Sequence, residues 1–140
     1  MFCSGVLLGT RDGILVGAVT ELVYSLLNPY GPAAPLITAA QVVGMAAAGA
    51  AGGALASAGI GTFPVALRAA VLATSAVVVT QIFDLLTNLA GGYMYGQVRL
   101  MLIGGIPFSL WHTGWNVVFF VVIGTPLVGG LSHYRSRLSS

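Results

Sequence analysis

The sequence predicts an all-α integral membrane protein, a helical bundle of about four full transmembrane helices preceded by a short apolar segment. The first observation is composition, because 57% of the 140 residues are hydrophobic and only 6% are charged. The second is a mean hydropathy of +0.97. A soluble domain carries about 25% charged residues, so this chain has too few charges to cover a water-facing surface. The third is the spacing of its breaks, which leaves apolar stretches of about the 20 residues that a crossing helix needs.

The breaks divide one domain, residues 1–140, into its elements. Residues 1–8 are apolar but too short to span. Residues 9–13, 28–32 and 59–64 are rich in Gly and Pro and indicate connections. A Gly/Tyr segment, a short apolar stretch and Gly104-Gly105-Ile106-Pro107 precede the last helix, and Pro126 is expected to kink its far end. The predicted spans are residues 13–28, 35–58, 65–90 and 107–131.

The third span carries the polar face around which the other helices are expected to pack. Gln81, Asp84 and Asn88 are spaced so that they share one helical face. A carboxylate in such a segment costs several kcal/mol unless it faces protein groups or water. Asp84 is therefore expected either to staple two helices through hydrogen bonds or to form one wall of a polar pocket.

The first two spans add fewer polar groups. Glu21, Ser25 and Asn28 share a face of the first span. In the second span, Gln41 is the only strongly polar side chain, and small residues recur every four positions at Gly44, Ala48, Gly52 and Ala56. Such stripes allow membrane helices to approach closely. This stripe is expected either to pack within the chain or to dock another membrane subunit.

The fourth span begins with a cluster of aromatic and polar residues. His112 and Asn116 share a face, and Trp111 and Trp115 lie beside it. Rings with a few polar groups are typical of small-molecule pockets, in which Asp84 is expected to hold a cationic or NH-rich heterocycle. The alternatives are tryptophans that anchor at the interface and a histidine that bonds Asp84 in the core.

Catalysis is not expected from this sequence. Asp84, His112 and Ser109 could form a nucleophile, base and orienter, but no nucleophile elbow is present. Adding Glu21 to Asp84 and His112 gives too few ligands for a metal site. No phosphate-binding loop is present, so the chain is not expected to hydrolyse ATP by itself. We expect no enzyme activity, no cofactor and no nucleic-acid partner.

The distribution of Arg predicts the orientation. With four spans, Arg11, Arg68, Arg135 and Arg137 lie on one side of the membrane and Arg99 on the other. The positive-inside rule then places both termini in the cytoplasm, in a multi-pass protein of the plasma (inner) membrane. This orientation puts most polar groups of the spans in the outer half, as a cavity that opens outward would require.

Several segments resemble the substrate-binding S components of energy-coupling factor (ECF) transporters. Residues 7–18 match their pattern Leu-Leu-Gly-x-x-x-Gly-x-x-x-Gly-Ala, and residues 28–32 with Pro35 resemble the loop that follows. Residues 84–88, and residues 105–108 with His112 and Asn116, are similar to the last two helices of such proteins. The resemblance implies a six-helix bundle that binds a vitamin-like nutrient near its outer face. It also implies docking to a transmembrane coupling subunit that carries two ATPases.

The resemblance also implies candidate ligand contacts, namely Asn28, Asp84, Asn88, Trp111, His112 and Asn116. Additional candidates from the polar faces are Glu21, Gln41 and Gln81. The chain starts inside the family's second helix, so we expect either a misplaced start at Met1 or a shortened variant. The small-residue stripe would then replace the missing docking helix. The leading hypothesis is a substrate-capturing importer subunit, and the rival is a non-transporting membrane scaffold or assembly subunit of similar fold.

Overall fold

A computed structural model describes residues 1–138 of the chain, and the side chains of residues 1–134. The described part contains helices and no strand, so the predicted all-α class is confirmed. The elements in order are α1 (Phe2–Leu8), α2 (Thr10–Leu26), α3 (Pro35–Ser57), the 3-10 turn η1 (Ile60–Thr62), α4 (Val65–Met94), α5 (Val98–Gly104), α6 (Ile106–Phe119), the π-helical turn η2 (Phe120–Gly124) and α7 (Thr125–Leu138).

Three helices of the described part are long and apolar enough to cross a membrane. They are α3, α4 and the continuous helix from α6 through η2 into α7, and they match the predicted spans 35–58, 65–90 and 107–131 closely. The first predicted span, residues 13–28, corresponds to α2, which is not among the three. An α-helix as short as α2 extends roughly 25 Å, which is less than the hydrocarbon core of about 30 Å.

The break predicted over residues 9–13 is confined to Gly9. This residue has φ 96°, a left-handed conformation that glycine adopts without steric cost, and it separates α1 from α2. Helix α2 already begins at Thr10, with Asp12 in its first turn, where a negative charge complements the helix dipole. The predicted apolar segment before it is therefore a short helix of its own.

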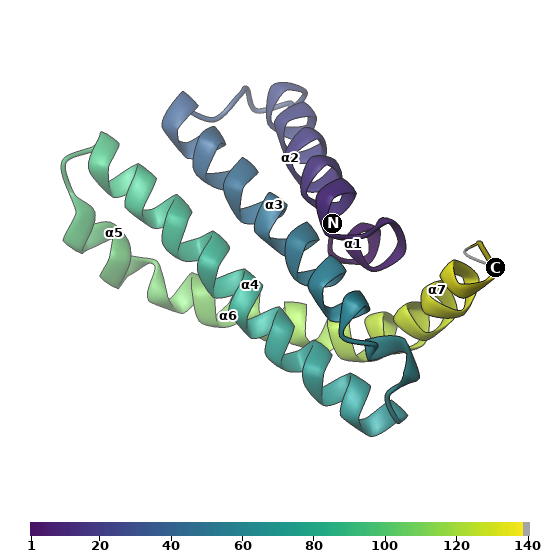
Figure 1. Cartoon of the computed structure of the whole chain (residues 1–140). Coiled ribbons are helices and arrows are strands. Elements are labelled where there is room, and N and C mark those ends of the chain that lie inside the picture. The colour runs from purple at the N-terminus through teal and green to yellow at the C-terminus, as the bar shows by residue number, and fades with distance from the viewer. Residues whose placement is uncertain (139–140) are drawn as a thin grey trace.

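Helices α2, α3, α4 and α6 pack one against the next, in that order, and α5 lies beside α4 (Figure 1). Helix α1 packs across α2 and α3 and also contacts α7. The buried core lies where α1, η1, α4 and α7 meet, and it consists of Phe2, Val6, Ile60, Leu72 and Val128.

Glycines bring the backbones of α1, α2 and α3 into contact. A side-chain carbon at Gly13 would lie 2.5 Å from the Cα of Gly5 and 2.7 Å from the carbonyl oxygen of Gly49. A carbon at Gly17 would collide with the backbone at Met45. Only glycine allows the three helices to approach this closely, which is the packing that small-residue spacing predicts in membranes.

The stripe proposed for docking lies inside the chain. Gly44 faces Phe83 of α4, and Gly52 faces the backbone of α1. Ala48 is buried, and Ala56 packs against the core. The intramolecular interpretation of Gly44, Ala48, Gly52 and Ala56 therefore describes this structure, and the stripe does not form an exposed docking face.

Arg68 ties the connection between α3 and α4 to α7. Its guanidinium donates hydrogen bonds to the carbonyl oxygens of Ile60, Gly61, Phe63 and Thr125, at distances from 2.8 to 3.3 Å. A planar guanidinium can serve several carbonyls at once because its five N–H groups point in fixed directions. This charge thus has backbone partners and fixes the position of α7.

The π-helical turn η2 ends two residues before Pro126. Proline has no N–H to bond the carbonyl of Val122, and its ring would clash with that carbonyl in a regular α-helix. A wide turn relieves this clash, and the helix axis changes direction between α6 and α7 (Figure 1). The predicted kink at Pro126 thus has its counterpart in the structure.

Candidate functional site

A carboxylate in α4 holds two side chains of α6. Asp84 is only 3% exposed. The Ser109 hydroxyl donates to its Oδ2 atom at 2.7 Å, and Nδ1 of His112 lies 2.8 Å from its Oδ1 atom. A carboxylate only accepts hydrogen bonds, so Nδ1 of His112 carries a hydrogen. Both oxygens of Asp84 are therefore engaged within the protein.

Three further hydrogen bonds continue this network along the same pair of helices. The amide nitrogen of Gln81 donates to the hydroxyls of Ser109 and Thr113, at 3.0 and 2.8 Å. Asn116 donates to the hydroxyl of Thr80 at 2.9 Å. Residue numbers rise along α4 while those of their partners fall along α6, so the two helices are antiparallel. The network fixes their register through side chains in an otherwise apolar interface.

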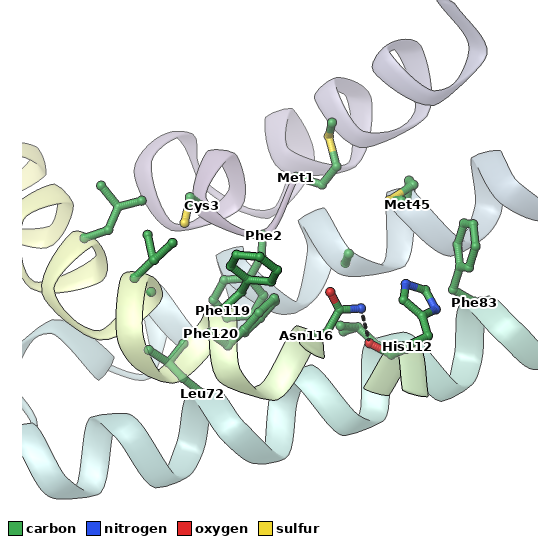
Figure 2. Close-up of a pocket in the computed structure, with 17 residues that line it drawn as sticks. Met1, Phe2, Cys3, Met45, Leu72, Phe83, His112, Asn116, Phe119 and Phe120 are labelled. Carbon is green, nitrogen blue, oxygen red and sulfur yellow. Dashed lines mark hydrogen bonds between the residues drawn. The ribbon is translucent and has the colours of Figure 1, made fainter. Parts of the chain in front are cut away.

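The larger of two described cavities lies on one side of this network, with a volume of about 440 Å³. Side chains of α1, α3, α4, α6, η2 and α7 line it, and most are apolar. Its polar side chains are Cys3, Thr80, His112 and Asn116, and no acidic side chain, Arg or Lys lines it. Met1, which carries the N-terminal ammonium, also lines it. Figure 2 shows His112 and Asn116 at one end of this cavity, with Phe2, Phe119, Phe120 and Leu72 farther along.

A smaller cavity of about 150 Å³ lies between α4, α5 and α6. Gln81, Asp84, Asn88 and Ser109 supply its polar lining. Asn88 lies against the backbone of Gly105, where a side-chain carbon would be 2.6 Å from its Nδ2 atom. The predicted face of Gln81, Asp84 and Asn88 is thus gathered at this second cavity, whereas His112 and Asn116 line the larger one.

The remaining polar candidates lie on α2, on α3 and in the turn between them, apart from both cavities. Asn28 accepts a hydrogen bond from the backbone N–H of Tyr30 at 3.0 Å and so shapes the turn after α2. The hydroxyl of Ser25 donates to Gln41 at 3.4 Å, which joins α2 to α3. Glu21 is buried one helical turn before Ser25. The structure does not bring Asn28, Glu21 or Gln41 to the Asp84 network.

The two tryptophans lie on the exposed surface of α6. Trp111 is 67% exposed and Trp115 is 48% exposed, and their rings meet edge to face at 5.7 Å. Neither lines either described cavity. Exposed rings are what the interfacial-anchor alternative predicts, whereas the stacking platform expected for a ligand would place them in a cavity.

Thr80 and Phe83 also line the larger cavity and were not singled out from the sequence. Thr80 lies four residues before Asp84, so the helical spacing that identifies Asp84 and Asn88 includes it as well. The hydroxyl of a helical threonine commonly donates a hydrogen bond to a backbone carbonyl of the preceding turn, so the sequence alone does not indicate that Thr80 bonds another helix. In the sequence Phe83 is an ordinary apolar residue, and only its contact with Gly44 in the structure distinguishes it.

The hydrogen-bond geometry bears on the catalytic arrangement considered for Ser109. The hydroxyl of Ser109 and the imidazole of His112 bond the same carboxylate of Asp84. A nucleophile must instead reach the imidazole, with the carboxylate on the far side of the ring. Ser109 thus serves here as a donor that orients Asp84.

No protein-family profile, curated protein or solved structure matches this chain.

Proposed function

We propose that this protein captures a small organic molecule in the membrane, in the cavity bounded by His112 and Asn116. The observation that carries the proposal is the cavity itself, with its volume of about 440 Å³. Small-molecule sites occupy roughly 300–1,000 Å³, and a mostly apolar lining with a few convergent polar groups is typical of them. A helix pair held only for scaffolding would need the staple between α4 and α6 but not this space.

We further propose that the molecule is a nutrient and that the chain acts as an S-component-like subunit of an ECF-type importer. The segment resemblances support this hypothesis, as does the absence of a phosphate-binding loop. The partners would then be a transmembrane coupling subunit and two ATPases. In this proposal α2 also crosses the membrane, with its short length met by local thinning of the bilayer.

Native mass spectrometry of the purified protein tests capture directly. The wild-type chain is expected to retain one small molecule from the cell membrane, seen as a defined added mass. Ala48 is buried and lines the cavity, so Ala48→Met adds volume there and should release that mass. The same fold without an added mass in the wild-type spectrum would favour the scaffold hypothesis.

The importer hypothesis needs a separate measurement. A tagged chain isolated from its native membrane in mild detergent should carry ATP hydrolysis with it, and nutrient uptake should stop when the chain is deleted. Absence of both effects, with the captured molecule still present, would leave a binding protein that works without ATPases.

The proposed orientation has both termini in the cytoplasm. A fluorescent protein that folds only in the cytoplasm, fused after Ser140, should therefore be bright. A phosphatase active only outside the cytoplasm should be inactive at the same site. The reverse result would contradict the orientation drawn from the Arg distribution.

A further inference from the structure

The polar end of the larger cavity favours one chemical class of ligand, and this inference rests on the proposed function. We infer that the cavity takes an uncharged, mostly apolar molecule with a hydrogen-bond donor, a hydroxyl or an N–H, that is accepted by Nε2 of His112.

Asp84 determines which nitrogen of His112 faces the cavity as an acceptor. Oδ1 of Asp84 accepts a hydrogen bond from the N–H at Nδ1 of His112, and the two atoms lie 2.8 Å apart. In the neutral imidazole Nε2 then carries a lone pair and accepts. His112 lines the cavity, and no hydrogen bond to Nε2 is found among the described residues. The Ser109 bond to the other carboxylate oxygen keeps Asp84 in this orientation.

Asn116 adds a second acceptor at the same end. Its amide nitrogen donates to Thr80, which leaves the carbonyl Oδ1 directed away from that bond (Figure 2). His112 and Asn116 are one helical turn apart, and side chains at this spacing are neighbours, about 5–6 Å between Cβ atoms. Two acceptors side by side match a ligand end that presents donors.

The lining charges argue against an ionic ligand. No Asp, Glu, Lys or Arg side chain lines the cavity, and the one charged group among its lining residues is the N-terminal ammonium of Met1. Both oxygens of Asp84 are already bonded on the other side of the His112 ring. A cation placed here would lose its hydration without gaining an anionic partner, and an anion at the polar end would face the two acceptors of His112 and Asn116, so both are unfavourable there. The larger cavity therefore favours a neutral donor, whereas the sequence predicted a cationic or NH-rich heterocycle held by Asp84.

Four pyrene derivatives with the same ring test this inference on the full chain in detergent micelles. They are 1-hydroxypyrene, 1-methoxypyrene, 1-pyrenecarboxylate and 1-pyrenemethylammonium, which offer a donor, an acceptor only, an anion and a cation. Binding is read as energy transfer from the tryptophans of α6 to pyrene. Signal that persists in Ala48→Met is partitioning into the micelle and is subtracted.

We expect saturable binding of 1-hydroxypyrene, about tenfold tighter than that of 1-methoxypyrene, because one buried hydrogen bond is lost. The two charged derivatives should show no saturable binding. In His112→Phe, which keeps a ring but removes the acceptor, the two neutral derivatives should bind equally. Thr113→Val is the matched control, because Thr113 follows His112 and belongs to the network but does not line the cavity. It should keep the tenfold preference.

The outcomes separate this inference from the proposed function. Equal binding of the two neutral derivatives to the wild-type chain overturns the donor inference and leaves small-molecule capture standing, as does a preference that survives His112→Phe. Saturable binding of a charged derivative at similar strength overturns the uncharged class. Absence of saturable binding for all four overturns capture itself. The comparison on the wild-type chain decides the matter even where His112→Phe does not fold.

Discussion

Replacing Gly13 with alanine probes the contact on which the arrangement of α1, α2 and α3 depends. The new carbon would lie 2.5 Å from the Cα of Gly5 and 2.7 Å from the carbonyl oxygen of Gly49, whereas ordinary contact begins near 3.4 Å. Both neighbours are backbone atoms, which cannot rotate away as a flexible side chain can. The helices must therefore separate by roughly 0.7 to 0.9 Å.

The cost follows from that displacement. A gap of about 0.5–1 Å forfeits about a quarter to a half of the attraction of each contact, and overpacking costs about 1–3 kcal/mol in total. The substitution also stabilises the folded state by about 0.5–1 kcal/mol, because alanine restricts the unfolded backbone more than glycine does. The free energy of unfolding of Gly13→Ala should therefore fall by about 1–2 kcal/mol, a factor of roughly 5–30 in the ratio of folded to unfolded protein.

Titration with SDS in mixed micelles, followed by circular dichroism, measures this difference. Gly114→Ala is the matched control, because no atom lies within 4 Å of the carbon that it adds to α6. The control should be neutral or more stable than the wild-type chain. Equal midpoints for Gly13→Ala and wild type, or equal losses for the two variants, would refute the close backbone packing of the three helices.

Substitutions at three other positions test the hydrogen-bond network of Asp84, the contacts of Arg68 and the exposed tryptophan pair. Asp84→Ala leaves two donors without an acceptor and should lower the unfolding free energy by about 3 kcal/mol in the same titration; an unchanged midpoint would contradict the network. Arg68→Met should speed protease cleavage in residues 59–64 about tenfold, because four backbone carbonyls lose their hydrogen-bond donor. The cleavage rate of Arg68→Lys should be intermediate. Cleavage of Arg68→Met at the wild-type rate would contradict the role of Arg68 in holding this connection to α7. Trp111→Leu should bind 1-hydroxypyrene with an affinity within about twofold of the wild-type value, because a residue that touches no ligand contributes little to binding. Trp115 remains as the fluorophore for this measurement. A tenfold loss of affinity would place Trp111 in the ligand site.

The long helices were predictable because their ends have strong local signals. Pro35 begins α3, Pro64 precedes α4 and Pro107 lies in the first turn of α6, where a missing N–H is not needed. The start of α2 was not predictable from the sequence, because residues 9–13 have the composition of a loop. Only the positive φ of Gly9 breaks the helix, and the sequence does not distinguish Gly9 from Gly13.

Helical spacing predicted the faces of the site but not their partners. It correctly grouped His112 with Asn116, and it grouped Asp84 with Asn88. The division of these pairs between two cavities depends on the rotation of α6 against α4, which is set by contacts across the whole interface. For the same reason the sequence could not decide whether Trp111 faces a ligand or the outside.

The π-helical turn has a consequence for how this helix tolerates changes of length. Each residue of an α-helix advances the side-chain direction by about 100°, so one surplus residue would normally turn everything after it away from its neighbours. The wide turn at residues 120–124 absorbs such a surplus and leaves Val128 fully buried in the core. A deletion of one residue within that turn should remove the surplus and keep Val128 facing inward, while Pro126 still bends the helix. The same deletion one turn earlier in α6 would misdirect either Asn116 or the hydrophobic side chains that follow it.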